Sequence, residues 1–459
     1  MIKHISHKIF ITVFILIALH ASPDGPQTSR YTDSIHSFVN FGTFALQKGY
    51  RSHIDILLLN NNAYSVIPPG IPILLAPLYF LHQMLMRLIG IPEGEVYWSI
   101  FDILSNVCVS APLLGIVAVI MFKTLDYFTN DLVKKLWLVF TFIFGSLVFF
   151  YSTNGIWSHV YTMSFIFIAF YLIIHQANGF FIGLSLGFAQ MVDYIAIVPI
   201  SLLIGFWIYL MIKERNYTSM LTNMLLLLFG YSIFVGIIMY YNQSITGSVL
   251  QTPNSLFLKQ LNQEDSIQKS MFMVPSLGTI WGLTFSSFRG IFLYFPMSFL
   301  FIGSFVKKTY QKNNVILFCF IFFAFIFVLN ASYYAWSGDV CFGPRHLVVA
   351  TPFILLPVVY SPLKYIKLLG VLSMFINLAG VSTIPSNNLL INIAMFLYRG
   401  PLLHWQDYFY KVILPQYYNI HLSSMTPFFI YLAIGFVLYL MWKPSINQQD
   451  VLLKDRLIS

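Results

Sequence analysis

Arg345 and His346 stand in the stretch SYYAWSGDVCFGPRHL (332–347), which is polar and lies between two long apolar runs. Polar backbone and charge of this kind cannot face lipid, because each unsatisfied group there costs several kcal/mol. Arginine presents a rigid fork of donors that suits phosphate oxygens, and the start of the following helix adds partial positive charge. Asp339 would hold Arg345 in place or bind a divalent ion. The residue types therefore predict an anion-binding rim, with Arg345 and His346 as substrate ligands.

Three further ionisable residues stand where apolar runs begin or end. His159 lies in TNGIWSHVY, Asp193 in GFAQMVDYIAIVP and Arg289 in FSSFRG. Each also has a plain structural explanation. His159 would be an interfacial histidine beside tryptophan, Asp193 a cap that joins two helices, and Arg289 an arginine that snorkels to lipid headgroups. The functional explanation is that all three contact a phosphate or a hydroxyl of the substrate.

Asp33 is the candidate general base. It lies in SRYTDSIH, with Arg30 three residues before it and His36 three residues after it. On one helical turn these side chains would share a face, so a cation would keep the carboxylate ionised and ready to accept a proton. Asp24 and Asp55 occupy the same loop and are rivals for this role, and a solvated loop helix is the plain alternative.

The composition defines the class of protein that positions these residues. Hydrophobic residues make up 58% of the 459-residue chain and charged residues 9%, against about 25% charged in soluble domains. This predicts an all-α, polytopic integral membrane protein. The net charge of +9 then reports orientation in the membrane and not nucleic-acid binding. The three cysteines have no metal-ligand spacing, and no phosphate-binding loop or dinucleotide motif supports soluble nucleotide chemistry.

About twelve transmembrane helices are predicted. The first is a retained anchor at the N-terminus, and an exported loop at 22–69 follows it with short amphipathic surface helices. The run Gly70–Gly90 is predicted to be an interfacial or re-entrant helix, because spanning would export Lys123, Lys134 and Lys135. The other spans lie near 103–122, 136–152, 160–175, 180–193, 195–212, 218–241, 290–306, 314–331, 347–360, 367–384 and 426–442.

This arrangement gives the two faces of the membrane different charges. The cytoplasmic segments then carry fifteen basic and five acidic residues, as the positive-inside tendency requires. All the polar motifs above fall at the exported face, where one shared cavity is the economical prediction. Residues 1–360 form a catalytic module, and 361–459 add C-terminal helices, an exported loop at 385–425 and a short cytoplasmic tail.

The order of these motifs resembles the GT-C superfamily of membrane glycosyltransferases, in particular the branch of protein O-mannosyltransferases and the lipid A aminoarabinose transferase. The likeness covers roughly residues 8–360. The residues that carry it are Arg30 to Asp33, Gly49 to Asp55, Ala63 to Gly70, Tyr151-Ser152, Trp157-Ser158-His159, Tyr334 to Gly338 and Phe342 to Arg345.

The resemblance implies a polyprenyl-phosphate sugar as donor and a lipid, glycan or protein acceptor on the exported face of a bacterial plasma membrane. It also implies inversion at the anomeric carbon, with Asp33 as the base and arginine and histidine holding the departing lipid phosphate. SRYTDS lacks the adjacent acidic pair usual in the family, so the identity of the base and the need for a divalent metal stay open.

Two other functions share many of these features. A flippase or transporter of lipid-linked glycans would bury charge at the bilayer midplane and often shows paired halves. In this chain the charged motifs gather at one predicted face and no repeat is evident. A polymerase or ligase of surface glycans is the other alternative. A structure in which Asp33 and Arg345 approach one cavity would favour sugar transfer.

Overall fold

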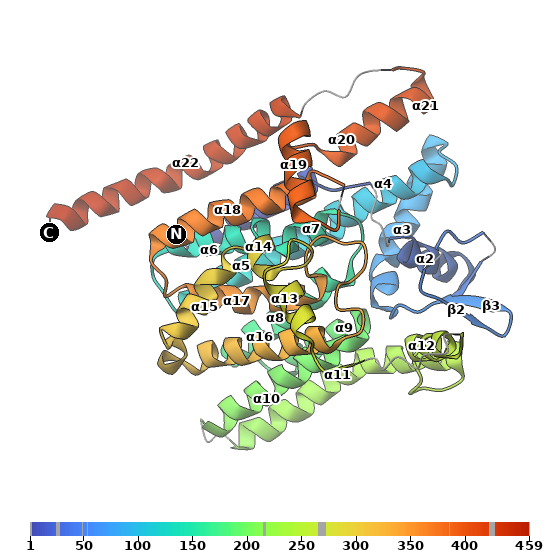
Figure 1. Cartoon of the computed structure of the whole chain (residues 1–459), viewed down its shortest axis with the longest axis horizontal. Coiled ribbons are helices and arrows are strands. Elements are labelled where there is room, and N and C mark those ends of the chain that lie inside the picture. Colours follow the sequence, from blue (N-terminus) through green and yellow to red (C-terminus); the bar gives the residue numbers. More distant parts are fainter. Residues whose placement is uncertain are drawn as a thin grey trace.

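The computed structural model describes residues 2–23, 28–47, 49–52, 54–213, 217–264, 272–384, 386–421 and 427–458. These residues form a mostly helical structure with one small sheet (Figure 1). The N-terminal half contains α1 (Ile2–Leu19), α2 (Ser29–Phe41), β1 (Ala45–Leu46), β2 (Ile56–Leu59), β3 (Asn62–Ser65), α3 (Gly70–Ile89), α4 (Glu95–Ser105), α5 (Ala111–Asp126), α6 (Leu132–Phe144), α7 (Leu147–Thr153), α8 (Ser158–Ile174), α9 (Gly179–Val192), α10 (Ile197–Lys213) and α11 (Tyr217–Thr246).

The C-terminal half contains three long helices, α16, α18 and α22, and several shorter ones. They are α12 (Pro253–Glu264), α13 (Leu277–Thr284), α14 (Ile291–Tyr294), α15 (Ser298–Val306), α16 (Asn314–Ser332), α17 (Thr351–Val358), α18 (Leu363–Val381), α19 (Leu389–Arg399), α20 (His404–Tyr408), α21 (Leu414–Tyr418) and α22 (Phe428–Ile458). Short 3₁₀ segments precede α10 (Tyr194–Ala196), α16 (Thr309–Lys312) and α17 (Arg345–Ala350), and π-helical turns at Asn106–Ser110 and Phe409–Ile413 join α4 to α5 and α20 to α21.

The helical membrane class is confirmed by length and composition. In the described part of the chain, six helices are long and apolar enough to cross a membrane, or seven if the pair α6 and α7, bent by 50°, counts as one span. Six shorter apolar helices accompany them. The predicted span near 290–306 is not one helix, because Pro296 separates α14 from α15 and proline cannot continue the helical hydrogen bonding.

The loop at 22–69 is only partly helical, so the prediction of surface helices alone is wrong. Gly42 ends α2 with a left-handed conformation (φ 63°), after which an antiparallel sheet forms in the order β1-β3-β2. Asn60 and Asn61 both have positive φ, which is the backbone of a tight hairpin turn between β2 and β3. Phe44, between α2 and β1, packs edge-to-face on Tyr241, with 4.7 Å between the ring centroids.

Helix α3 does not turn back on itself, and its placement as an interfacial helix that does not span stays a prediction. It runs unbroken for 20 residues, and length and composition make it a candidate span. At its start a Cβ on Gly70 would lie 2.5 Å from the carbonyl oxygen of Met191, so α3 begins in close contact with the end of α9. Leu88, at its other end, is 84% exposed.

Helices α9 and α11 are in direct backbone contact. Gly179, Gly183 and Gly187 lie four residues apart on one side of α9, and Cβ atoms there would lie 2.0 to 3.0 Å from backbone oxygens of Asn223, Leu227 and Tyr231. Small residues at this spacing let membrane helices approach closely and gain dispersion contacts.

Replacing Gly183 with valine is therefore expected to destabilise the protein by about 1–3 kcal/mol, as overpacking does elsewhere. The melting temperature in detergent measures this effect. Gly236→Val on α11 is the matched control, because nothing lies within 4 Å of a Cβ at that position. Equal melting temperatures for the two variants would contradict the close packing.

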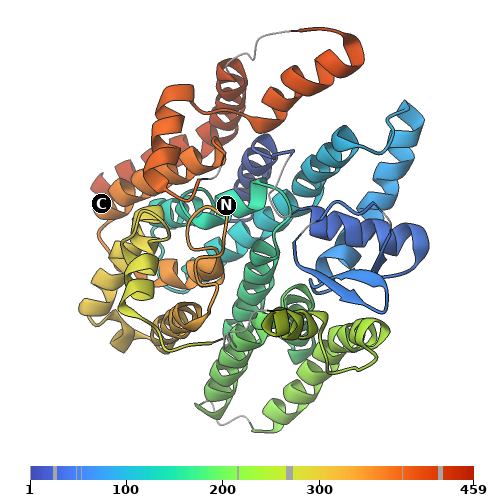
Figure 2. The ribbon, with the colours of Figure 1, turned by 45° about the vertical axis from the view of Figure 1, so that its right-hand side comes forward.

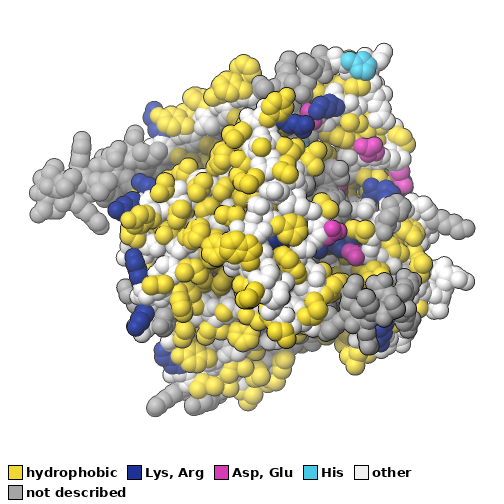
Figure 3. All heavy atoms as spheres, in the orientation of Figure 1, with side chains coloured by type: hydrophobic (Ala, Val, Ile, Leu, Met, Phe, Trp, Pro, Cys, Tyr) yellow, Lys and Arg dark blue, Asp and Glu magenta, His cyan; other side chains and the backbone are white. Residues whose placement is uncertain are grey.

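The segments that connect the helices lie at two ends of the bundle. At one end Lys134 Nζ donates to the Val359 carbonyl (3.1 Å) and Ser304 Oγ to the Pro357 carbonyl (3.1 Å). The start of α6 and the ends of α15 and α17 therefore meet, close in sequence to Lys134, Lys307 and Lys364. The loops with the predicted site residues lie at the other end, together with α2 and the sheet (Figure 1). Figure 3 shows hydrophobic side chains over most of the surface between these ends.

The C-terminal helices pack on the first helix, as Figure 2 shows for α22 beside α1. Trp442 Nε1 donates to Thr12 Oγ1 (3.0 Å), and a ring nitrogen of His20 lies 3.0 Å from the Tyr431 hydroxyl. Asn377 of α18 donates to the carbonyls of Gly145 and Tyr294, at 3.0 and 2.9 Å. The last hundred residues thus contribute to the same core as the first 360.

Candidate functional site

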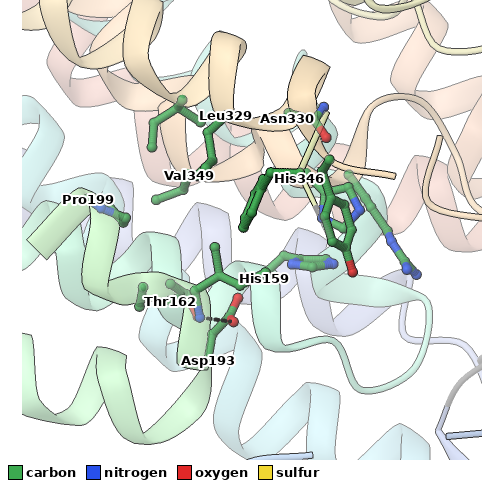
Figure 4. A pocket seen from close by; sticks show the side chains of 14 residues that line it. His159, Thr162, Asp193, Pro199, Leu329, Asn330, His346 and Val349 are labelled. Carbon is green, nitrogen blue, oxygen red and sulfur yellow. Dashed lines mark hydrogen bonds between the residues drawn. The ribbon is translucent and has the colours of Figure 1, made fainter. Parts of the chain in front are cut away.

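Four of the eight predicted site residues line one cavity of about 70 Å³, here called the first cavity. They are His159, Asp193, Arg345 and His346. Figure 4 shows His159 and Asp193 on one side of the cavity and His346 and Asn330 on the other. Residues far apart in the sequence therefore meet at the loop end of the bundle.

The short turn between α7 and α8 positions His159. Gly155 has φ 77°, which reverses the chain after α7, and Trp157 Nε1 donates to the Asn154 carbonyl (2.6 Å) to fix the turn. His159 then lies in the first turn of α8, with its ring 5.5 Å from the ring of His346 at an interplanar angle of 78°.

Asp193 serves both as a helix cap and as a lining residue. Its Oδ1 accepts a hydrogen bond from the backbone N–H of Ile195 (3.0 Å) and so starts the 3₁₀ segment before α10. Burial raises the pKa of Asp193, although that hydrogen bond and the charges of Arg30 and Arg345 oppose the rise. A carboxylate with a raised pKa is a better proton acceptor than an ordinary one.

The guanidinium of Arg345 lies 5.8 Å from the centre of the Trp157 ring. Its path is open because Gly338 (φ 73°) has no side chain: a Cβ there would lie 2.7 Å from Arg345 Nε. Nε and Nη1 of Arg345 are buried and have no hydrogen-bond partner in the described part of the chain, and the same holds for His346 Nε2. Buried donors of this kind are normally paired, so they indicate a binding site for an anion.

The remaining walls of the first cavity are largely apolar. They are formed by Ile195, Ala196, Pro199, Phe272, Ile326, Leu329 and Val349. A cationic group beside an apolar wall suits an anion that carries a hydrocarbon chain.

Asp33 lies on α2 and its carboxylate is engaged elsewhere. Oδ2 accepts hydrogen bonds from the backbone N–H groups of Arg51 (2.9 Å) and Ser52 (2.8 Å), and Oδ1 lies 3.4 Å from Arg51 Nε. Arg51 also lies over the Trp98 ring, 4.1 Å from its centre. Asp33 does not line the first cavity, so the predicted approach of Asp33 and Arg345 to one cavity is not found.

The expected pairing within α2 is wrong. Arg30 forms an ion pair with Asp55, and His36 lies nearest to Glu93, at 3.6 Å. Arg30 does act electrostatically on Asp193 and His159, so it stands near the first cavity. Asp24, the other rival base, lies outside the described residues.

Arg289 is completely buried and fixes the loop that precedes Arg345. It donates to the backbone carbonyls of Ser337 and Asp339, to its neighbour's carbonyl at Phe288 (2.8 Å) and to Asn387 Oδ1 (2.9 Å). The side chain of Asp339 is exposed, and in the described structure it forms no ion pair with Arg345. These two residues shape the loop and do not line the first cavity.

Replacing Arg289 with alanine is expected to destabilise the protein by roughly 3 kcal/mol, because the carbonyls of Ser337, Asp339 and Phe288 and the side chain of Asn387 would all lose a donor. The melting temperature in detergent should fall well below that of Arg399→Ala, an exposed arginine on α19. An unchanged melting temperature with a raised KM for substrate would instead make Arg289 a substrate ligand.

The described residues contain no group of three or more histidine, cysteine or acidic side chains able to hold a metal ion. No protein-family model matches the chain, and no curated protein or solved structure matches it either. Function is therefore argued from the first cavity itself.

Proposed function

We propose that this protein is a membrane glycosyltransferase that uses a polyprenyl-phosphate sugar as donor. The observation that carries the proposal is the pair of buried, unpartnered nitrogens on Arg345, next to His346 and His159 and against an apolar wall. A polyprenyl phosphate combines an anion with a hydrocarbon chain, which matches both halves of this lining. The GT-C likeness of the motifs agrees with it.

The reaction follows from the placement of these groups. The acceptor hydroxyl oxygen attacks the anomeric carbon, its proton passes to a carboxylate, and the bond between the sugar and the phosphate breaks. The electron pair of that bond leaves on the phosphate, where Arg345 stabilises the charge that develops. His159 and His346 orient the same phosphate by hydrogen bonding.

Asp193 is the carboxylate best placed to act as the base. It lines the first cavity with Arg345, whereas two backbone N–H groups and Arg51 already occupy the oxygens of Asp33. Asp33 then acts by fixing α2 against the segment at 51–52, beside the cavity.

The same proposal covers location and topology. The first cavity opens on the exported side of a bacterial plasma membrane, since the lysine-bearing loops at the opposite end follow the positive-inside tendency. The shorter apolar helices supply the additional crossings up to about twelve.

A donor-dependent transfer assay tests the function. Membranes that contain the protein are supplied with polyprenyl-phosphate sugars labelled in the sugar, and label should enter an acceptor only when the protein is present. Binding of the donor without any cleavage of the sugar–phosphate bond would reject sugar transfer and favour a lipid-linked glycan flippase.

A further inference from the structure

A second cavity of about 370 Å³ lies at the same end of the bundle. Four parts of the chain build it: the residues after α1, the turn before α8, the loop near 340, and the C-terminal segment that runs from the end of α18 through α20 into the π-helical turn Phe409–Ile413. Its lining consists of Ser22, Pro23, Asn154, Val340, Thr383, Ile384, His404, Asp407, Tyr408, Lys411 and Val412.

Most of the accessible lining of the second cavity is apolar, and its polar side chains are balanced in charge. Asp407 and Lys411 form an ion pair (2.8 Å), so neither presents an unbalanced charge to a ligand. Hydroxyl, amide and carboxylate groups together offer both donors and acceptors. The volume falls within the range of small-molecule pockets, about 300–1,000 Å³. This mixed lining suits an uncharged group that has both hydroxyls and apolar faces, such as a sugar ring.

The walls are held by hydrogen bonds to buried parts of the fold. Trp405 Nε1 donates to the Leu19 carbonyl at the end of α1 (2.8 Å), which fixes α20 in place. Asn392 Nδ2 donates to Thr383 Oγ1 (2.7 Å), which fixes the loop after α18. The second cavity is therefore defined before a ligand arrives, and preorganisation of this kind favours binding.

Two segments of the chain take part in both cavities. In the first segment, Asn154 lines the second cavity and His159 lines the first. In the other segment, Val340 lines the second cavity and Arg345 lines the first. The Tyr151 hydroxyl donates to the Phe342 carbonyl (2.8 Å) and so ties these two segments together. In each segment, the residue that lines the second cavity stands five positions before the residue that lines the first.

We propose that the second cavity binds the hydroxyl-bearing acceptor of the reaction. This inference rests on the proposed function and specifies the acceptor as a sugar-like group. The group is either a free saccharide or the head of a glycolipid, because both present the same hydroxyls.

Filling the second cavity tests this proposal. Ile384→Trp and Val412→Trp add bulk from two walls, and Ile384 is 66% exposed, so the fold tolerates the change there. Leu390→Trp on α19 is the matched control, since Leu390 is 65% exposed and does not line the cavity. The probe is a labelled polyprenyl-phosphate sugar in membranes that contain each variant, and label released to water is measured apart from label transferred.

Both filling variants should lower transfer at least about 10-fold while release of label to water stays within about 2-fold of the control, as expected for loss of acceptor binding alone. Label in organic extracts then indicates a glycolipid acceptor, and label in the aqueous phase a free saccharide. If both variants transfer labelled sugar at the control rate, the second cavity is not the acceptor site. The same conclusion follows if transfer to the acceptor and release of labelled sugar to water fall equally. The proposed function fails separately, if Arg345→Ala leaves transfer unchanged.

Discussion

Arg345→Ala should lower donor-dependent sugar transfer about 100- to 1000-fold, because it removes the donors that stabilise charge on the departing phosphate. The nitrogens Nε and Nη1 are buried and have no other partner in the described structure, so these donors are available to the phosphate. The loss should appear in kcat, since the charge on the bridging oxygen develops only as the bond breaks. Initial rates with saturating labelled donor measure it.

Arg345→Lys is the informative companion variant. Lysine keeps the positive charge but loses the planar fork of donors, so an intermediate rate is expected. Arg399→Ala controls for the general effect of removing a cation, because Arg399 is exposed on α19. Full activity of Arg345→Ala in a correctly folded protein would rule out the phosphate role.

Asp193→Asn is expected to lower transfer by about 100- to 10,000-fold, the usual contribution of a positioned general base. The amide keeps the shape of the carboxylate but cannot accept a proton. Asp33→Asn should have a smaller effect on kcat and should lower the melting temperature, since Asp33 accepts hydrogen bonds from Arg51 and Ser52. If Asp33→Asn abolishes transfer in a stable protein while Asp193→Asn stays active, the two roles are reversed.

The dependence of the rate on pH provides a second test of Asp193. The base acts only when it is ionised, so the rate falls as the pH drops through the pKa of its carboxyl group. Because burial raises this pKa above the ordinary value of 3.8, the fall should begin at a higher pH than for an exposed aspartate. The acid limb of the pH–rate profile should disappear in the residual activity of Asp193→Asn.

The central part of the site could be predicted because charge is rare in this chain. In a sequence with 9% charged residues, Asp193 and Arg345 between apolar runs need a shared polar environment, and the first cavity provides it. His159 and His346 followed from the same argument. The helical membrane class followed from composition alone.

The partners of these residues could not be predicted, because ion pairs between loops depend on how the loops fold. Arg51 pairs with Asp33 across 18 positions, and Arg30 with Asp55 across 25, whereas local spacing suggested Arg30 with Asp33. Arg289 resembled a phosphate ligand in sequence, yet backbone carbonyls occupy its donors. The spacing of Gly179, Gly183 and Gly187 was a signal for close helix packing that the prediction of spans did not use.

The contacts of α1 with α20 and α22 bear on how the chain is made. Leu19 and Thr12 accept hydrogen bonds from Trp405 and Trp442, partners 386 and 430 positions later. While a ribosome is still producing the middle of the protein, these groups lack their final neighbours. The contacts of α1 are therefore completed only after Trp405 and Trp442 have been made, and a chain that stops before Trp405 leaves that helix without these partners.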